Sequence, residues 1–285
     1  MKPTVYIIDA SPIFYKAFFA VPSHLASKSG IPTNAVYGFM SSLIKLLKTY
    51  DPKHMVICFD NRSNFRKEIF EGYKEDRKPM DNRLSMQIPV LKDIIKIMGI
   101  PLVEKSGYEA DDLIGMLAKW SEAQGANAII VSPDKDMAQL VNENVKVLYD
   151  LKEGLFMETN EVTTIFGVPP NKIVDLLALS GDTVDGIPGV MGIGGKTAVK
   201  LIQQYGSVED IYTNISSIKG SLKEKLEKNK EMAFISKQLA TIITEWKLDF
   251  EVLLDVERGF IQQEQLRSKF DALNFASLQK RLDDL

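Results

Sequence analysis

Short runs of β-branched and other apolar residues alternate along the chain with longer segments of helical periodicity. This alternation predicts an α/β fold with a mainly parallel central sheet flanked by helices. The predicted strands are 4–8, 55–59, 100–103, 128–131, 145–149 and 154–157, with the last two as an edge pair. The predicted helices begin near residues 11, 160 and 170 and cover 33–50, 85–98, 109–124, 196–205, 208–214, 232–244 and 262–269.

Three predicted strands are followed within a few residues by carboxylates, at Asp9, Asp60 and Asp134. Parallel strands end at the same edge of a sheet, so these side chains are expected close together. The chain has only two histidines and one cysteine, and Cys58 lies in an apolar run typical of a core strand. A zinc site of cysteine and histidine is therefore excluded, and magnesium or manganese held by oxygen ligands is favoured.

Further acids stand at the starts of predicted helices. Glu109, Asp111 and Asp112 lie within four positions in GYEADDLIG, and Asp136 follows Asp134 in SPDKDMAQLV. One acid suffices to cap a helix, whereas three so close repel one another unless a cation compensates them. The pattern favours metal binding by Glu109 and Asp111, while capping and metal binding remain equal alternatives for Asp112.

The segment SGDTVDGIPGVMGIGGKTA, residues 180–198, combines acids with glycines. Asp182 and Asp185 are three residues apart where a predicted helix ends. Gly189, Gly192, Gly194 and Gly195 follow, and Lys196 and Thr197 open the next helix. Backbone N–H groups at a glycine turn and a helix N-terminus bind anions, so this helix, hairpin and helix predict a phosphate-binding element beside two potential metal ligands.

The segment NRSNFRKEIFEGYKEDRKP, residues 61–79, interleaves basic, acidic and aromatic residues. It can be interpreted as a solvated, salt-bridged helix. Lys74 and Arg77 follow Tyr73 closely and come after the strand-end acid Asp60, which favours a role in gripping a phosphate. Tyr15, near the first strand-end acid, is equally suited to stacking on a base or to packing.

Composition limits the classes of protein. The chain of 285 residues is 45% hydrophobic and has a formal net charge of -3. Such a chain can build a large α/β domain with a smaller one attached, and cations bound by the clustered acids would leave the remaining charge positive. No apolar run reaches the roughly 20 residues of a membrane span, and no signal-peptide pattern precedes the first strand, so we expect a cytoplasmic protein without a membrane partner. We expect a core at 1–159, including a basic arch segment at about 62–81, and a helical part at 160–285 with C-terminal helices packing on the core.

With these motifs assembled, the chain resembles the 5′-3′ exonuclease and flap endonuclease family, and within it the nuclease domain of bacterial DNA polymerase I. The resemblance rests on several motifs in order, namely IIDAS, CFD, the FR and YKEDR segments, GYEADDLIG, DKDMAQLV, SGDTVDGIPGVMGIGGKTA and KEMAFISKQLATI. It implies a PIN-like α/β core with a helix-hairpin-helix subdomain at about 170–205. It also implies a DNA nuclease that hydrolyses a phosphodiester with two divalent cations, Mg²⁺ or Mn²⁺.

The resemblance also assigns roles to individual positions. The first metal is implied to lie among Asp9, Asp60, Glu109, Asp111 and Asp134, with Asp112 in support. The second is implied to lie among Asp136, Asp182 and Asp185, with Asp134 between the two sites. Lys74 and Arg77 match the pair that contacts the scissile phosphate. The implied DNA-binding residues are Tyr15, Arg66, Tyr73, Gly189, Gly192, Gly194, Lys196 and Thr197.

The expected partners follow from the same resemblance. They are DNA with a 5′ flap, a nick or a free 5′ end, bound by a monomer, with RNA primer ends remaining open as substrates. A monovalent cation such as K⁺ is implied at the hairpin. Two alternatives are a DNA-junction-binding protein without catalysis and an RNase of the related acid-cluster class. Departures from the family pattern stand at Lys16, Pro133, Val184 and Gly186.

Overall fold

A six-stranded sheet forms the centre of the protein. The computed structural model describes residues 2–61, 65–245 and 249–282. The strands are β1 (Thr4–Asp9), β2 (His54–Cys58), β3 (Leu102–Val103), β4 (Asn127–Val131), β5 (Val145–Asp150) and β6 (Leu155–Met157). Their order is β3-β2-β1-β4-β5-β6, and all neighbours pair in parallel except β5 and β6. This mainly parallel sheet, flanked by helices, confirms the predicted fold class.

Alternate residues of each strand supply two separate cores. Val5 and Ile7 of β1 face one cluster, and Tyr6 and Ile8 face the other. This division follows from the strand geometry, in which successive side chains point to opposite faces. Because both faces are covered, the strands are apolar on both sides, which explains their continuous runs of valine and isoleucine.

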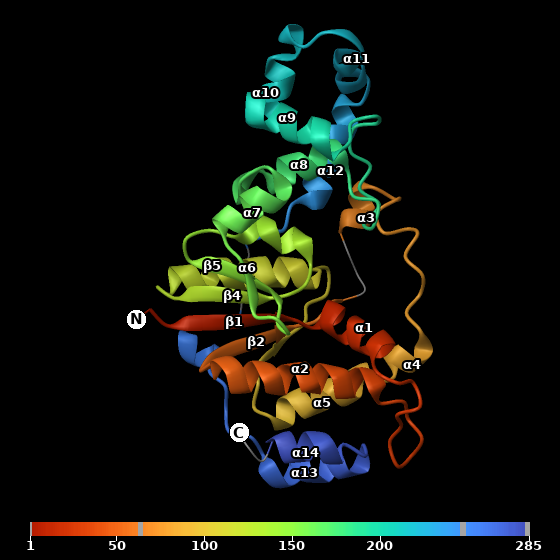
Figure 1. The fold of residues 1–285 in the computed structure, drawn as a ribbon, viewed down its shortest axis with the longest axis vertical. Coiled ribbons are helices and arrows are strands. Elements are labelled where there is room, and N and C mark those ends of the chain that lie inside the picture. Colours follow the sequence, from red (N-terminus) through yellow and green to blue (C-terminus); the bar gives the residue numbers. More distant parts are fainter. Residues whose placement is uncertain (1, 62–64, 246–248, 283–285) are drawn as a thin grey trace.

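One face of the sheet is covered by helices from both ends of the chain. They are α1 (Ala10–Ala20), α2 (Asn34–Tyr50), α4 (Asn82–Ser85), α5 (Ile88–Ile97), α13 (Gln263–Ala272) and α14 (Ala276–Leu282). Figure 1 shows α2 and α5 beneath the sheet, with α13 and α14 beyond them. The helix predicted at 85–98 is interrupted, and α5 starts only at Ile88. Pro89, which lacks an N–H, fits the first turn of this new helix.

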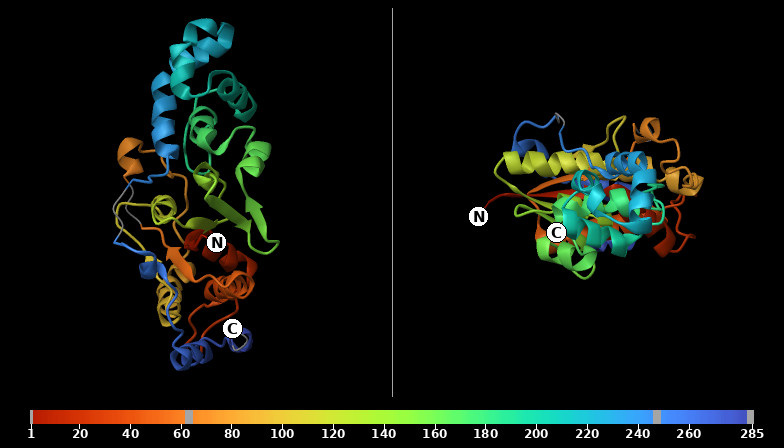
Figure 2. Two further views of the ribbon diagram at one scale, coloured as in Figure 1. Left: turned by 90° about the vertical axis from the view of Figure 1, so that its left-hand side faces the viewer. Right: turned by 90° about the horizontal axis from the view of Figure 1, so that it is seen from above.

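The other face carries α6 (Ala110–Ala123), and most of the remaining helices extend away from this side of the sheet. These are α7 (Thr159–Phe166), α8 (Ile173–Ser180), α9 (Gly195–Tyr205), α10 (Val208–Thr213), α11 (Gly220–Lys228) and α12 (Lys230–Ala240). Short 3₁₀ turns are η1 (Lys135–Leu140), η2 (Pro170–Lys172), η3 (Ile215–Ser217) and η4 (Leu253–Val256). The views in Figures 1 and 2 place α9–α11 at one end of the long axis and α13 and α14 at the other.

The basic arch segment expected at about 62–81 is only partly within the described residues, since 62–64 lie outside them. From residue 65 onward it contains a single short helix, α3 (Arg66–Ile69), followed by turns. It is therefore no long salt-bridged helix in its described part. The backbone of Lys74 has φ of 53°, the left-handed region that ends helical propagation.

Among the residues that the structure describes, no single helix has the length and apolar composition of a membrane span. A bent pair, Thr159–Phe166 with Pro170–Ser180, meets those two criteria only when taken together.

Candidate active site

Three strand ends bring carboxylates to one edge of the sheet. Asp9 ends β1, and Asp60 and Asp134 follow β2 and β4, the two strands that pair with β1. The exposed Asp60 accepts a hydrogen bond through Oδ1 from the backbone N–H of Ala110 at 2.9 Å. This bond holds the start of α6 at the same edge, and with it Asp111 in the first turn of that helix.

Asp9 is buried in an incomplete polar environment. Its side chain is 2% exposed, Oδ2 accepts a hydrogen bond from Ser132 Oγ at 2.8 Å, and Oδ1 has no hydrogen-bond partner in the described residues. Burial and the charge of Asp60 raise the pKa of Asp9 to about 8. Burial and the charges of Asp9 and Asp134 raise the pKa of Asp111 well above its usual value. An unsatisfied buried oxygen among mutually repelling carboxylates fits the donor set of a hard divalent cation.

A second group of acids adjoins the first. Burial and the charges of Asp134 and Asp182 raise the pKa of Asp136 to about 7. Asp182 is buried, and its Oδ2 lies 2.8 Å from Lys135 Nζ in an ion pair. Since Asp134 raises the pKa values of both Asp9 and Asp136, it is electrostatically coupled to both groups.

Lys74 and Arg77 contact the acids directly. Lys74 Nζ lies 2.5 Å from Glu109 Oε1 and 3.3 Å from Asp185 Oδ2. Arg77 Nη2 lies 2.6 Å from Asp185 Oδ1. Burial opposes the charge of Lys74 most strongly, but Glu109, Tyr73 and Asp185 together outweigh it and raise the pKa of the lysine. In this arrangement, no three acidic, histidine or cysteine side chains of the described chain are grouped closely enough to hold a metal ion.

Arg66, expected to bind DNA, is instead buried. It is 2% exposed and forms a two-pronged contact with Asp112, from Nη1 to Oδ2 at 2.8 Å and from Nη2 to Oδ1 at 2.7 Å. Its Nη1 also donates to Glu109 Oε2 at 3.2 Å, and its Nε and Nη2 donate to the carbonyls of Leu239 and Thr241. A guanidinium provides a planar set of donors that suits such a buried site. Arg66 thus joins α3 to the start of α6 and the end of α12.

Asp112 caps a helix, which was one of the two roles expected of it, and Tyr73, expected to bind DNA, is buried. Asp112 is fully buried, accepts the backbone N–H of Glu109 at 3.2 Å in a capping box, and accepts that of Ile243 at 2.9 Å. With Arg66, these contacts occupy its oxygens, so we omit it from the proposed metal ligands. The ring of Tyr73 is buried, and its hydroxyl donates to Glu109 Oε2 at 2.9 Å. In this position Tyr73 orients Glu109 and is not open to a base.

The hairpin after α8 explains the glycine at position 186. Asp182 and Ile187 form its isolated β-bridge, and the carbonyl of Asp185 accepts the backbone N–H of Lys74 at 2.9 Å. Gly186 has φ of 67°, and a Cβ there would lie 2.5 Å from the carbonyl oxygen of Gly72. The missing side chain therefore permits the close approach that places Asp185 beside Lys74.

A further turn, from Gly189 to Gly194, leads into α9. It contains the glycines that were predicted to form a hairpin between two helices. The N–H of Gly189 donates to Ser236 Oγ at 2.9 Å, and a Cβ on Gly189 would lie 2.4 Å from the nitrogen of Gly181. Gly194 is the N-cap residue of α9, and Lys196 in the first turn is exposed, while Thr197 is half-buried. The first N–H groups of a helix have no partner within it, so this end of α9 can receive an anion.

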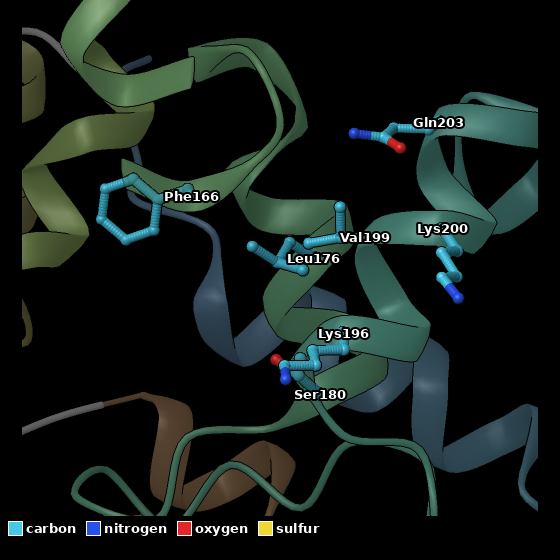
Figure 3. A pocket seen from close by; sticks show the side chains of 8 residues that line it. Phe166, Leu176, Ser180, Lys196, Val199, Lys200 and Gln203 are labelled. Atoms are coloured by element: carbon cyan, nitrogen blue, oxygen red, sulfur yellow. The ribbon is translucent and has the colours of Figure 1, made fainter. Parts of the chain in front are cut away.

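A shallow hollow of about 500 Å³ lies beside this end of α9. Figure 3 shows Lys196 next to Ser180 of α8, with Lys200 and Gln203 farther along α9. Leu176 and Val199 form an apolar floor between the two helices. The hairpin therefore presents basic side chains and backbone donors on one surface.

Tyr15 is partly exposed, and three residues without a predicted role, Ser132, Lys135 and Ser236, contact the site. Tyr15 is 49% exposed, and its ring centroid lies 5.1 Å from that of Phe19. Ser132 bonds Asp9, Lys135 pairs with Asp182, and Ser236 holds the hairpin through Gly189. Lys135 stands between two candidate acids in the sequence, which was a usable signal, whereas the two serines carried none.

Comparison with known proteins matches both parts of the chain to one family. The profile of the 5′-3′ exonuclease N-terminal resolvase-like domain matches residues 4–167. The profile of the 5′-3′ exonuclease C-terminal SAM fold matches residues 168–262.

Individual relatives include a 5′-3′ exonuclease of Aquifex aeolicus, 40% identical over 99% of this chain and 96% of the relative. DNA polymerase I of Caldicellulosiruptor bescii is 42% identical over 97% of this chain. The chain spans about a third of that polymerase, since the match covers 33% of its length.

Solved structures share the fold. Zinc-bound T5 5′-exonuclease superposes with a TM-score of 0.68 at 20% identity, covering 99% of this chain and 97% of the other. The catalytic core of Rad2 in complex with a DNA substrate gives a TM-score of 0.66 at 17% identity, covering 99% and 91%. The family profiles and the full-length relative agree, and the nuclease classification is thereby confirmed: the chain belongs to the 5′-3′ exonuclease family.

Proposed function

We propose that this protein is a metal-dependent 5′-3′ exonuclease and 5′-flap endonuclease that hydrolyses DNA phosphodiesters, as in the removal of primers and flaps during replication and repair. The observation that carries the proposal is the buried Oδ1 of Asp9, which has no hydrogen-bond partner among the described residues, in a carboxyl group whose pKa burial and the charge of Asp60 raise to about 8. Two divalent cations, Mg²⁺ or Mn²⁺, would supply a water of lowered pKa and neutralise the negative charge that develops on the phosphate.

The residues proposed to hold the cations fall into the two groups described above. The first is Asp9, Asp60, Glu109, Asp111 and Asp134, and the second is Asp134, Asp136, Asp182 and Asp185. Carboxylate oxygens are the ligands that Mg²⁺ prefers. The coupling of Asp134 to both groups supports its place between the two cations.

Lys74 and Arg77 are proposed to stabilise the reacting phosphate. Both carry positive charge at the acid site and now pair with Glu109 and Asp185. The two bases would be replaced by bound cations at the carboxylates of Glu109 and Asp185. Lys74 and Arg77 would then turn toward a bound phosphate. Positive charge aimed at developing negative charge acts mainly in the transition state.

The hairpin between α8 and α9 is proposed to hold the duplex backbone away from the cut. The N-terminus of α9 and Lys196 supply phosphate contacts that carry no sequence information. We also propose K⁺ at the hairpin carbonyls. The carbonyl of Gly192 accepts a hydrogen bond from Lys225 Nζ at 3.2 Å, so a cation at that oxygen would compete with the lysine.

The substrate is proposed to be a 5′ flap, a nick or a free 5′ end, with RNA primer ends as a further class. The terminal nucleotide must unpair to reach the acids, which costs least at a frayed or displaced end. Tyr15, exposed on α1, is an aromatic side chain available for stacking on an unpaired base. We also propose that the protein acts as a monomer with a core at 1–159 and a helical part at 160–285.

The test is cleavage of a 5′-labelled flap, a nicked duplex and a single strand with and without Mg²⁺. Wild type is expected to cut the flap only with Mg²⁺, and Asp134→Ala to reduce the rate by at least about a thousandfold. Asp76→Asn, which changes an exposed acid within the arch segment, serves as a matched acidic control with an unchanged rate. Equal rates for wild type and Asp134→Ala at saturating Mg²⁺ would refute the proposal.

A further inference from the structure

A second pocket, of about 470 Å³, lies where α1 and α2 meet the carboxyl ends of β4 and β5. One wall is formed by Ser132 and Pro133, immediately before Asp134. None of the proposed metal ligands lines this space. In a parallel α/β sheet, ligands bind outside the carboxyl ends of the strands where the strand order reverses, which here is between β1 and β4.

Short side chains create the space between the two helices. Ala17 and Ala20 of α1 face Gly38, Ser41 and Ser42 of α2 across the pocket. The helices approach closely at Gly38, where a Cβ would lie 2.6 Å from that of Ala17. The contact between α1 and α2 is therefore tight at Gly38, and the pocket beside it is a fixed feature of the packing.

The pocket is apolar in its floor and positively charged around it. Ile13, Val131 and Leu148 contribute apolar surface. The charged residues that line it are Lys16, Lys45, Lys152, Arg281 and Asp150. Four bases against one acid favour a ligand that is an anion with an apolar or planar body.

Two of these bases are held in place. The guanidinium of Arg281 donates from Nη1 to Ser41 Oγ at 3.2 Å and from Nη2 to the Ser41 carbonyl at 3.0 Å. Lys45 Nζ donates to the carbonyl of Lys152 at 2.5 Å. These contacts leave further N–H donors on both groups, since a guanidinium has five and an ammonium has three. Positioned cations lose less entropy when a phosphate binds.

We propose that this pocket binds a nucleoside 5′-monophosphate, with its phosphate between Lys45 and Arg281 and its base on the apolar floor. The choice of ligand rests on the proposed function, because 5′-3′ exonuclease cleavage releases such nucleotides beside Asp134, next to the pocket wall. The volume is in the range of about 300 to 1,000 Å³ that is usual for small-ligand sites. The hydroxyls of Ser41 and Ser42 offer hydrogen bonds to sugar or base.

The test titrates the full chain with dAMP by calorimetry in EDTA, without DNA, so that neither the proposed metal site nor a cleavage product contributes. We expect saturable binding of dAMP and at least about tenfold weaker binding of deoxyadenosine, since one charge-assisted phosphate contact is worth about that factor. Lys45→Gln should weaken dAMP binding about tenfold. Lys48→Gln, an exposed lysine on the same helix outside the pocket, should leave it unchanged.

A pocket-filling variant, Ser42→Tyr, should abolish dAMP binding while thermal unfolding and Mg²⁺-dependent flap cleavage remain those of wild type. The proposal is overturned if dAMP shows no saturable binding up to about 10 mM, or if Lys48→Gln weakens dAMP binding as much as Lys45→Gln does. It is also overturned if decanoate, an anion with an apolar chain and no base, binds and dAMP does not. These outcomes are separate from the proposed nuclease function. Failure to cleave the flap refutes that function, whereas cleavage without dAMP binding refutes only the pocket.

Discussion

Replacing Arg66 separates a buried structural role from a DNA contact. In Arg66→Met the apolar volume is largely kept, but the guanidinium that pairs with Asp112 and Glu109 is lost. The carboxylate of Asp112 is fully buried and would keep only backbone donors. Removing one partner of such a buried pair costs about 3–5 kcal/mol, because the other charge is left uncompensated.

The assay is thermal unfolding at pH 7.5 with EDTA, where a loss of this size lowers Tm by about 10 °C for a chain of this length. The double variant Arg66→Met with Asp112→Leu should recover part of the loss, because no buried charge remains unpaired. Recovery is incomplete because Asp112 also accepts the N–H groups of Glu109 and Ile243. Lys67→Met, an exposed neighbour, should change the free energy of unfolding by less than about 0.5 kcal/mol.

Unchanged stability with weakened DNA binding would assign Arg66 a different role. An unchanged Tm in Arg66→Met, with DNA affinity lowered and the salt dependence of binding reduced by about 0.9 in slope, would refute the reasoning and make Arg66 a phosphate contact.

Three further predictions follow from the site. Lys74→Ala should lower kcat by about a hundredfold or more and change DNA affinity little, and equal losses in both would make Lys74 a docking residue. Gly186→Ala should lower the free energy of unfolding by about 1–3 kcal/mol in urea titrations, because its Cβ would meet the Gly72 carbonyl at 2.5 Å, and wild-type stability would contradict this. Asp9 ionises near pH 3.9 when unfolded but at about pH 8 when folded, so its contribution to metal-free stability should fall as pH rises between these values. Asp9→Asn should flatten that decline, and parallel pH profiles of wild type and variant would contradict the assignment.

The sequence predicted the fold class and the position of the strand-end acids because both depend on local patterns. Apolar runs that lead into Asp9, Asp60 and Asp134 are sufficient to predict that these acids lie near one another, because the ends of parallel strands share one edge of the sheet. The glycine hairpin before α9 was also visible, because its turns require backbone angles that glycine adopts readily.

The interior partners could not be predicted in the same way. Arg66 stands in a charged segment that reads as surface, and only the tertiary contact with Asp112 and the end of α12 explains its burial. Tyr73 likewise packs under Glu109, 36 residues away in the sequence. Charged and aromatic residues carry no local signal for such contacts, because the compensating partner comes from a distant part of the chain.

The most direct test of the account counts the cations bound by the acids. Metal-free protein is titrated with Mn²⁺ at pH 7.5, and free Mn²⁺ is measured by electron paramagnetic resonance. The account predicts two ions per chain for wild type and, for Asp134→Ala, loss of at least one ion or affinity weakened by about tenfold or more at both sites. Asp134→Ala that binds Mn²⁺ with the number and affinity of wild type would contradict it.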